Sequence, residues 1–353
     1  MSRLRVAVCG AGNWGRNHVR TVASLPEAEL VVVCDPDAKR LAQVARQYPA
    51  VQTTADLEET LGLAEAVVVA APATHHATIA TAAIERGLPV LVEKPFALSS
   101  EAARQVAELA DQRGVPVVAG HLLLFHPAVV RLREMVASGD LGSVYYLHSQ
   151  RVNLGQIRPD ENALWSFGPH DISVALHLMG KRPIAVAARG HSYLQPGIED
   201  VVFLTLEFES GAMAHVQMSW LDPHKERRLT VVGSKRMVVF DDMQPREKLK
   251  IFDKGVDRPP EYRSFGESLS VREGDISIPR IPNEEPLTAE LRHFVAVARG
   301  EEQPRVTAWD GVEVVEILEV ASASLRGDGR ALQLEAGRNP RNESQGARND
   351  PAA

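Results

Sequence analysis

The sequence predicts an α/β Rossmann-like arrangement, that is, a doubly wound parallel sheet, followed by an α+β domain with a large, mainly antiparallel open sheet. Up to residue 125, short apolar runs alternate with helical segments of about ten residues or more, which is the pattern of βαβ units. From residue 144 to 252, longer strands dominate. Short turns such as 209–211 and 233–235 join several of them, which indicates antiparallel pairing.

Composition and charge narrow the class of protein. A chain of 353 residues is long enough for about two domains, and 44% hydrophobic with only 5% aromatic residues is typical of α/β enzymes. A net charge of -7 without long basic runs argues against a nucleic-acid or anionic-membrane partner. The sequence has no apolar run of the ~18 residues that a membrane span needs and no secretory signal, so we expect a cytoplasmic protein.

We place the first domain at residues 1–125 and the second at residues 126–330, with a C-terminal helix that could pack back on the first domain. Residues 337–353 are rich in Arg, Asn, Gly, Pro and Ser, which predicts a disordered tail. The two cysteines, Cys9 and Cys34, lie in apolar runs and are interpreted as small buried hydrophobes rather than a disulfide.

The first strand, residues 4–9, leads into the glycine-rich segment GAGNWG at residues 10–15 and then a helix at residues 16–24. This G-x-G-x-x-G pattern becomes a good signal when it lies between a strand and a helix. Its glycines permit a tight turn, close approach to a pyrophosphate and close helix–strand packing, while the helix N-terminus offers N–H groups to the anion. A dinucleotide site is therefore predicted here.

A second strand, residues 30–34, ends at Asp35, about where such folds place the acid that binds the adenosine ribose. A carboxylate would repel a 2′-phosphate, which favours NAD over NADP, although Lys39 and Arg40 follow closely and could accept that phosphate. The alternative is that Asp35 and Asp37 only cap the helix that starts near residue 38.

Further strands at residues 66–71, 90–92 and 115–119 alternate with helices at residues 76–86 and 99–113, the second capped by Ser99. Ligands of doubly wound sheets bind beyond the carboxyl ends of the strands. The polar residues predicted at that edge are Pro72, Thr74, His75, Glu93, Lys94 and His121. We expect the chemistry at residues 91–96, where an apolar strand ends in Glu93, Lys94 and a proline.

The second domain begins with a helix at residues 127–138 and continues with strands at 144–153, 184–193, 201–208, 212–220, 228–232, 236–240 and 249–252. In residues 212–220 the alternation places Ala214, Val216, Met218 and Trp220 on one face and His215, Gln217 and Ser219 on the other. A half-polar sheet lies against solvent or another subunit. We favour the second, and expect a homodimer or homotetramer formed through this sheet.

Helices are also predicted at residues 287–299 and 309–325, the second with a capping-box-like start at Thr307 and Asp310. The segment 162–172 leads into an apolar helix at residues 174–179, with His170 and Asp171 at its opening. Such polar residues indicate either hydrogen-bonded structure or chemistry, and an acid is also favoured near a helix N-terminus. The residues leave both alternatives open.

The glycine-rich segment, Glu93-Lys94-Pro95, Gly120-His121 and Pro169-His170-Asp171 together resemble the glucose–fructose oxidoreductase / inositol dehydrogenase / MocA family, from about residue 4 to 325. The resemblance implies that Lys94 and His170 flank the sugar hydroxyl that is oxidised. Residues 164–171, with Arg151, Asn153 and residues 219–221, look most like the nucleotide-sugar 3-dehydrogenases. Those enzymes make a 3-keto sugar that an aminotransferase uses, in lipopolysaccharide or lipid A biosynthesis.

One position departs from the family. Many members have an aspartate four residues before the histidine, and this chain has Ser166 there. A serine can relay a hydrogen bond but cannot hold charge or accept a proton at neutral pH. Any acid–base role of that aspartate is therefore in doubt for this chain.

The residues and the resemblance together define a predicted site, with Lys94 and His170 as its catalytic pair. Around NAD we expect Gly10, Gly12, Asn13, Trp14, Gly15, Asp35, Pro72, Thr74, His75, Glu93, Lys94 and His121. Around the substrate we expect Arg151, Asn153, Arg158, Trp165, Ser166, His170 and Asp171. No metal is expected, because the adjacent His75 and His76 would diverge.

Oxidation of a secondary alcohol needs a group that takes the hydroxyl proton and one that stabilises the developing alkoxide. His170 has a suitable pKa for a base, and Lys94 could supply charge or, if burial lowers its pKa, act as base itself. Arg151, Arg158, Lys225 and Arg227 could contact a diphosphate, or could be ordinary surface residues.

The leading hypothesis is NAD-dependent oxidation at C3 of UDP-N-acetylglucosamine or its uronic acid. The first alternative is a free-sugar or cyclitol dehydrogenase on the same scaffold. The alternative from another class is a dinucleotide-binding regulatory protein without catalysis, suggested by Ser166.

Overall fold

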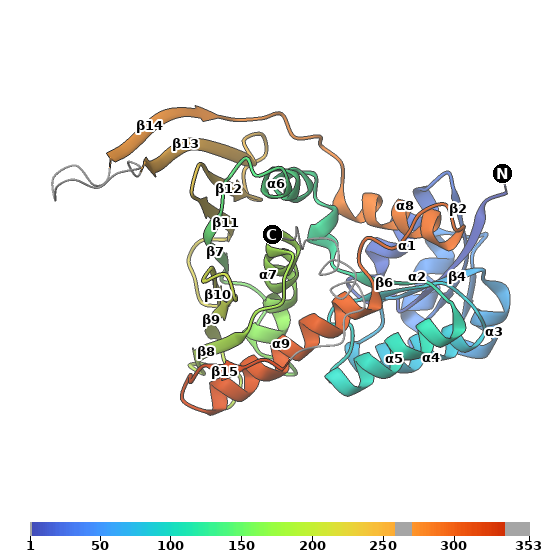
Figure 1. Cartoon of the computed structure of the whole chain (residues 1–353). Helices are drawn as coiled ribbons and strands as arrows, with labels where there is room; N and C mark the ends of the chain where they lie inside the picture. Colours follow the sequence, from blue (N-terminus) through green and yellow to red (C-terminus); the bar gives the residue numbers. More distant parts are fainter. Residues whose placement is uncertain (1, 258–269, 336–353) are drawn as a thin grey trace. The chain divides into compact units, whose positions relative to one another are not determined.

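A computed structural model describes residues 2–257 and 270–335 of the chain (Figure 1). The described residues form two compact units: 2–125 with 284–316, and 126–257 and 270–283 with 317–335. Residues 284–316 belong to the first unit. The predicted division into 1–125 and 126–330, with a C-terminal helix that could pack back on the first domain, stays a prediction. The tail at residues 337–353, predicted to be disordered, lies outside the described residues.

The first unit contains a six-stranded sheet whose described strands are all parallel, in the order β3-β2-β1-β4-β5-β6. The doubly wound sheet is thereby confirmed. The order reverses at β1 and β4, and in such sheets the ligand site lies beyond the carboxyl ends of the strands at this point. The strands are β1 Leu4–Cys9, β2 Ala28–Cys34, β3 Gln52–Thr54, β4 Ala66–Val69, β5 Val90–Glu93 and β6 Val117–Gly120.

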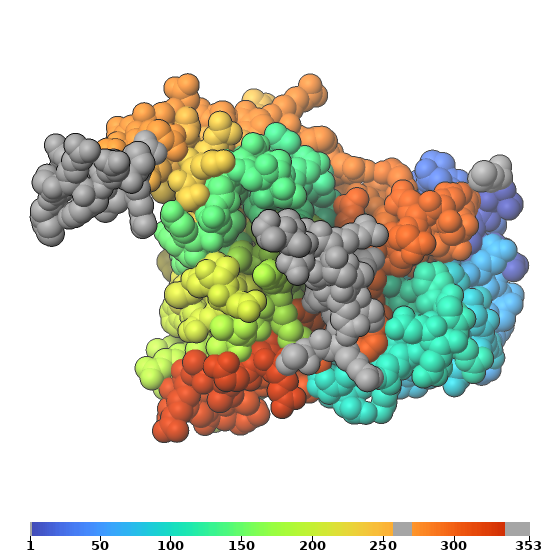
Figure 2. Space-filling model, viewed as in Figure 1, coloured from blue at the N-terminus to red at the C-terminus, as the bar shows by residue number. Residues whose placement is uncertain are grey.

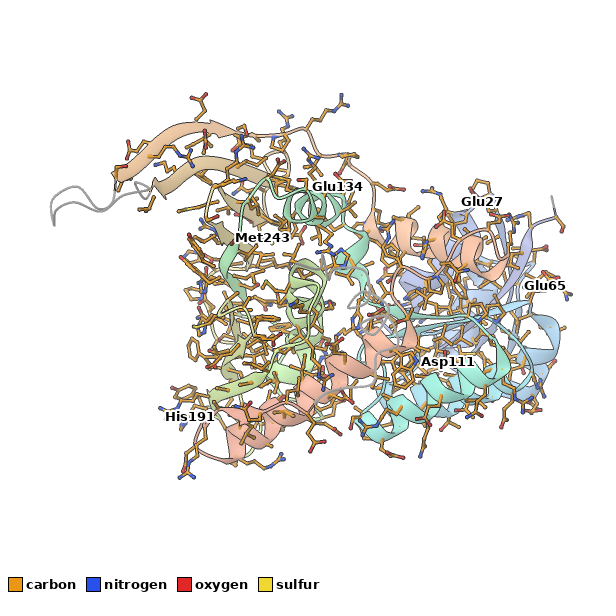
Figure 3. All side chains as sticks on the ribbon, in the orientation of Figure 1. Glu27, Glu65, Asp111, Glu134, His191 and Met243 are labelled. Carbon is orange, nitrogen blue, oxygen red and sulfur yellow. The ribbon has the colours of Figure 1, made fainter. Side chains whose placement is uncertain are left out.

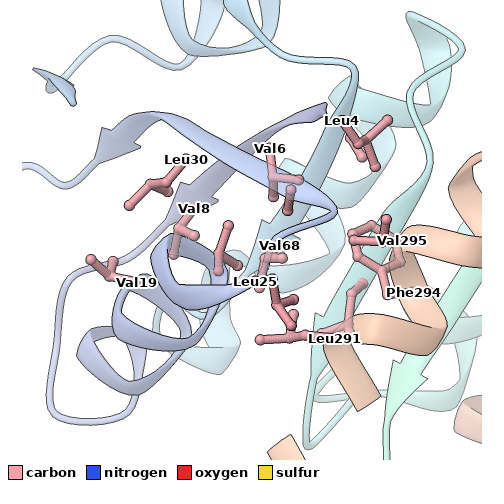
Figure 4. Packing of buried hydrophobic residues seen from close by; sticks show 14 of the residues in the cluster. Leu4, Val6, Val8, Val19, Leu25, Leu30, Val68, Leu291, Phe294 and Val295 are labelled. Atoms are coloured by element: carbon pink, nitrogen blue, oxygen red, sulfur yellow. The ribbon is translucent and has the colours of Figure 1, made fainter. Parts of the chain in front are cut away.

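Helices cover the sheet of the first unit, and one core cluster joins α1 and α8 to it. Figure 4 shows Leu291, Phe294 and Val295 of α8 close to Leu25 and Val68. Full burial of such side chains contributes ~1.5–3 kcal/mol each. The helices are α1 Gly15–Ser24, α2 Ala38–Gln47, α3 Leu57–Leu63, α4 His76–Glu85, α5 Ser100–Arg113 and α8 Pro286–Ala298, with the 3-10 turns η1 Ala73–His75 and η2 Leu122–Phe125. Helix α9, Ala308–Arg326, belongs to the first unit up to Glu316 and to the second from Ile317.

Helix α9 starts with the predicted capping box. The N–H of Thr307 donates to Asp310 Oδ2 at 2.6 Å, and the N–H of Asp310 donates to Thr307 Oγ1 at 3.3 Å. The indole of Trp309 donates to Asp111 of α5 at 2.8 Å, and Asp111 is labelled in Figure 3. The N-terminal part of α9 is thus tied to the first unit.

The second unit contains a mixed nine-stranded sheet in the order β14-β13-β12-β11-β7-β10-β9-β8-β15. Its described pairs are antiparallel except β7 with β10. The predicted turns at residues 209–211 and 233–235 join antiparallel pairs, as expected. The strands are β7 Val144–Val152, β8 Ala185–His191, β9 Val201–Glu207, β10 Met213–Ser219, β11 Glu226–Gly233, β12 Met237–Asp241, β13 Leu249–Asp257, β14 Ser270–Ser277 and β15 Leu332–Gln333.

The two faces of this sheet differ as the alternation predicts. Ala214, Val216, Met218 and Trp220 are all buried, and helix α7, Ala163–Met179, packs on that side. Tyr146, Phe203 and Met213 are exposed on the other face, where the rings of His148 and His215 stack at 5.7 Å. Ser219 is nevertheless buried. Association of subunits through the open face stays a prediction.

Strand β14 lies at one end of the sheet order and pairs with β13 (orange in Figures 1 and 2). Val271 and Ile276 are exposed, but Arg272, Glu273 and Asp275 lie on the same strand. Charges on an edge strand discourage pairing with other chains.

The predicted start of one helix is wrong. Helix α7 begins at Ala163 rather than at residue 174, and Asn162 caps it by accepting the N–H of Trp165 at 3.1 Å. Gly168 and Pro169, which normally end helices, lie inside it. His170 and Asp171 are therefore interior residues, and the favourable effect of a helix N-terminus on an acid does not explain Asp171. The first helix of the second unit, α6 Pro127–Ala137, lies close to the predicted range.

Candidate active site

The glycine-rich loop connects β1 to α1, and two of its glycines are required by packing. A Cβ on Gly10, whose φ is +106°, would lie 2.5 Å from the carbonyl oxygen of Ala70. A Cβ on Gly15 would lie 2.0 Å from the carbonyl oxygen of Gly10. Gly12 differs, because its Cβ would meet only Arg40 Nη1 at 3.8 Å, an ordinary contact. Protein packing does not demand a glycine there, so the open space fits the approach of a pyrophosphate.

The acid after β2 is fixed against this loop. Asp35 is 2% exposed, and its Oδ2 accepts the N–H of Ala11 at 2.7 Å. Asp37 is the residue that caps α2, accepting the N–H groups of Lys39 and Arg40 at 2.8 and 3.4 Å. The helix-capping role therefore falls on Asp37. Arg40 Nη1 lies 3.6 Å from Asp35 Oδ2, and contact of Asp35 with a ribose stays a prediction.

The carboxylate of Glu93 collects donors at the end of β5. The indole of Trp14 donates to Oε1 at 2.5 Å, His18 Nε2 bonds the same oxygen at 2.7 Å, and the N–H of Lys94 donates to Oε2 at 3.0 Å. Burial would raise the pKa of Glu93, but the hydrogen bond and charge of His18, with Trp14 and the Lys94 N–H, lower it below its usual value. Glu93 is thus an ionised, buried anchor for the loop and for Lys94.

Two histidines border Lys94. His76 Nδ1 bonds the carbonyl of Pro95 at 2.8 Å and Nε2 bonds the carbonyl of Ala71 at 2.8 Å, so His76 ties the end of β4 to the segment after Lys94. Sequence reasoning did not predict this role of His76, because its partners are backbone carbonyl groups that no local pattern identifies. The ring of His121 is buried, and burial lowers its pKa to about 4, so it is neutral near pH 7.

The remaining predicted cofactor residues lie at the same edge of the first unit. Gly12 is half-buried and Asn13 is exposed in the loop, and Pro72, Thr74 and His75 lie in or next to the exposed turn η1. The side chain of Lys94 itself is half-buried, and its peptide bond to Pro95 is cis. The structure thus gathers these residues at the carboxyl ends of the strands.

In the second unit, a buried ion pair fixes α7 to the sheet. Arg151 Nε donates to Asp171 Oδ2 at 2.5 Å, and the hydroxyl of Ser149 donates to Asp171 Oδ1 at 2.6 Å. Both Arg151 and Asp171 are 8% exposed. The position of His170, the next residue back along α7, is therefore set by its neighbour's charge.

The other predicted substrate residues also have partners within the second unit. The indole of Trp165 donates to the hydroxyl of Ser322 at 3.0 Å, and the backbone N–H of Asn153 donates to the carbonyl of Ser219 at 3.1 Å. Arg158 pairs with Glu161 at 3.0 Å. Ser166 is buried and His170 is half-buried. Contact of any of them with a substrate stays a prediction.

Among the described residues, no group of three or more His, Cys, Asp or Glu side chains could hold a metal ion. Within the same residues, no helix is both long and apolar enough to cross a membrane.

Two family models match this chain. Residues 4–121 match the model described as oxidoreductase family, NAD-binding Rossmann fold, and residues 129–239 match the GFO/IDH/MocA C-terminal domain. The chain belongs to the GFO/IDH/MocA family. This confirms the resemblance inferred from the motifs.

Several curated relatives of this GFO/IDH/MocA protein have similar identity. Inositol 2-dehydrogenase 2 of Saccharopolyspora erythraea is 28% identical over 91% of this chain and 93% of its own length. The scyllo-inositol 2-dehydrogenase (NAD(+)) of Bacillus subtilis is 27% identical over 95% of this chain and 98% of its own length. UDP-N-acetylglucosamine 3-dehydrogenase of Acidithiobacillus ferrooxidans is 27% identical over 74% of this chain and 80% of its own length.

Solved structures agree with the fold. A putative oxidoreductase from Magnetospirillum magnetotacticum is 33% identical, with a TM-score of 0.77 and coverage of 90% of this chain and 99% of that chain. GenD2 from gentamicin A biosynthesis, solved in complex with NAD, is 28% identical, with a TM-score of 0.79 and coverage of 95% of this chain and 97% of that chain. The first unit of this protein is an NAD-binding domain, as predicted.

The two cysteines are free, which confirms that they form no disulfide, but they are not equivalent. Cys9 and Cys34 face each other as Cα partners of β1 and β2. The hydrogen bond from Cys9 lowers the pKa of Cys34 to about 7, outweighing the effect of partial burial, whereas the pKa of Cys9 is raised. Cys34 is therefore a small polar group rather than a simple hydrophobe.

We expect the rate at which iodoacetamide alkylates Cys34 to rise with pH through a midpoint near 7, since only the thiolate reacts. Cys9→Ala removes the hydrogen bond that stabilises the thiolate and should move that midpoint to higher pH. Peptide mass spectrometry after timed labelling measures this, with Cys34→Ser as the unlabelled control. An unchanged midpoint in Cys9→Ala would rule out the hydrogen bond as the cause.

Arg151→Met should lower the free energy of unfolding by about 3–5 kcal/mol, because it leaves the buried carboxylate of Asp171 unpaired. The double variant Arg151→Met/Asp171→Leu removes both charges and should recover a large part of that loss. Urea unfolding followed by circular dichroism compares the midpoints. A double variant no more stable than the single one would contradict this account of the ion pair.

Proposed function

We propose that this protein oxidises a secondary hydroxyl of a neutral polyhydroxylated ring, a cyclitol or a free sugar, with NAD as the oxidant. Membership of an NAD-binding oxidoreductase family supplies the reaction class. Similarity to two inositol dehydrogenases over at least 91% of this chain supports the ring substrate.

The two candidate catalytic residues have complementary roles. Bound NAD supplies the hydride acceptor. We assign His170 as the group that accepts the hydroxyl proton and Lys94 as the cation that stabilises negative charge on the oxygen. The N–H of Lys94 is fixed to Glu93, and α7 is fixed next to His170 by Asp171. Ser166 cannot hold charge, so the site gains no further carboxylate from that position.

A neutral ring is favoured over a nucleotide sugar because the arginines that could bind a diphosphate already form ion pairs with carboxylates. A substrate diphosphate would be bound by cations that remain available to it. Arg151 is paired with Asp171, Arg158 with Glu161, and Arg227 with Asp242 at 3.6 Å. Three of the four cations considered for a diphosphate therefore already contact carboxylates of their own unit.

A nucleotide sugar is the second candidate substrate, specifically UDP-N-acetylglucosamine oxidised at C3. It is favoured by the motif around residues 164–171 and by the 27% identity to a UDP-N-acetylglucosamine 3-dehydrogenase. Its 3-keto product would suit an aminotransferase. A binding-only regulatory role has less support, because both Lys94 and His170 are retained.

The test is a matched panel in which NADH formation is measured with myo-inositol, scyllo-inositol, glucose, UDP-N-acetylglucosamine and its uronic acid. We expect turnover of a neutral ring that falls by at least about a hundredfold in Lys94→Met and in His170→Asn. Arg131→Ala, which alters an exposed arginine on α6 that pairs with Glu134, is the control and should leave that turnover unchanged. Turnover of UDP-sugars alone would overturn the proposal, and unchanged activity in both catalytic variants would favour the regulatory role.

A further inference from the structure

Several polar side chains are buried in the first unit, and none has been given a part in the reaction. His18 and Thr21 lie on α1 and Glu290 lies on α8, and each is 0% exposed. His121, which follows β6, is 1% exposed. Burial of four polar side chains in a region of valines and leucines requires hydrogen bonds.

Many of these polar atoms have no partner among the described residues. The atoms concerned are His18 Nδ1, Thr21 Oγ1, both carboxyl oxygens of Glu290 and both ring nitrogens of His121. Native proteins leave few buried polar atoms unsatisfied, and buried water is the usual partner. We therefore expect ordered water among these groups.

Glu290 and Glu93 cannot both be ionised at low cost. Burial, and then the negative charge of Glu93, raise the pKa of Glu290 well above its usual value. Glu93 is the ionised member, because it has three donors, whereas Glu290 has none among the described residues. A neutral carboxyl group both donates and accepts, so it can hydrogen-bond water and histidine together.

The groups belong to one region. Helices α1 and α8 pack together, with Val19 and Val22 in the same core cluster as Leu291. His18 bonds Glu93 at 2.7 Å, and Glu93 is the charged group that acts on both Glu290 and His121. Lys94 and Asp310 are the other charged groups that act on His121.

We propose that Glu290 is a positioning residue: its carboxyl group hydrogen-bonds Nδ1 of the His18 imidazole through buried water, and so holds the chain from His18 through Glu93 to Trp14. That chain fixes the glycine-rich loop against β5. Glu290 lies on α8, 197 residues after Glu93 in the sequence (290 − 93). It thereby acts on NAD binding without touching the dinucleotide. The inference rests on the NAD-binding domain and not on the ring substrate proposed above.

The test uses NAD binding and spectroscopy without substrate, so its failure is distinct from failure of the proposed substrate. Glu290→Gln keeps the size and neutral hydrogen bonding, and Glu290→Leu keeps only the size. Val297→Ala, a core truncation on the same helix, is the control for lost stability. The readouts are the NAD dissociation constant, the Trp14 contribution to fluorescence, obtained by subtracting Trp14→Phe, and the infrared carbonyl band of a protonated carboxylic acid.

We expect Glu290→Gln to bind NAD within about twofold of the parent chain, and Glu290→Leu to bind about tenfold more weakly with altered Trp14 emission. Val297→Ala should change neither the NAD dissociation constant nor the Trp14 emission. The infrared band should be present near pH 7 and absent in Glu290→Gln. Normal binding by folded Glu290→Leu would overturn the proposal, as would loss of binding in Glu290→Gln. If Glu290→Leu does not fold, the infrared band of the parent chain and the NAD affinity of Glu290→Gln still test the proposal.

Discussion

The NAD-binding unit depends on one buried carboxylate. Glu93 is 5% exposed at the end of β5, where an isolated charge would be costly. Trp14 and His18 reach it from the loop and from α1, and the N–H of Lys94 completes its donors. The balancing of this charge fixes the dinucleotide loop and the backbone of the candidate catalytic lysine relative to the same strand end. In the proposal above, the neighbouring polar group Glu290 helps to hold His18 and Glu93 in that arrangement.

The second unit also contains a buried carboxylate whose charge is balanced by neighbouring donors. Asp171 is buried and is balanced by Arg151 and Ser149 from β7, which anchors α7. In both units the carboxylate is the immediate sequence neighbour of the candidate catalytic residue: Glu93 precedes Lys94, and Asp171 follows His170. A catalytic residue must be held in place, and a buried ionic partner one residue away fixes its backbone.

Local patterns predicted much of the fold and part of the site. The glycine-rich turn, the acid after β2, the Thr307 and Asp310 cap and the alternation in β10 depend on neighbours in sequence. The start of helix α7 was predicted wrongly because Gly168 and Pro169 indicate a break, yet the helix runs through both residues. The short strand β3 and helix α3 lack a clear period. The partnership of His18 with Glu93 spans 75 residues, and no local pattern reports such a contact.

The central claim is that the charge of Glu93 links NAD binding to Lys94. Glu93→Gln tests it most directly, because an amide presents only one acceptor to the three donors. Calorimetric titration with NAD, alongside NADH formation with whichever substrate is turned over, gives both consequences, with exposed Glu101→Gln of α5 as the control. The account predicts that NAD affinity and turnover both fall by about tenfold or more. A folded Glu93→Gln protein with both quantities within about twofold of the parent chain would contradict it.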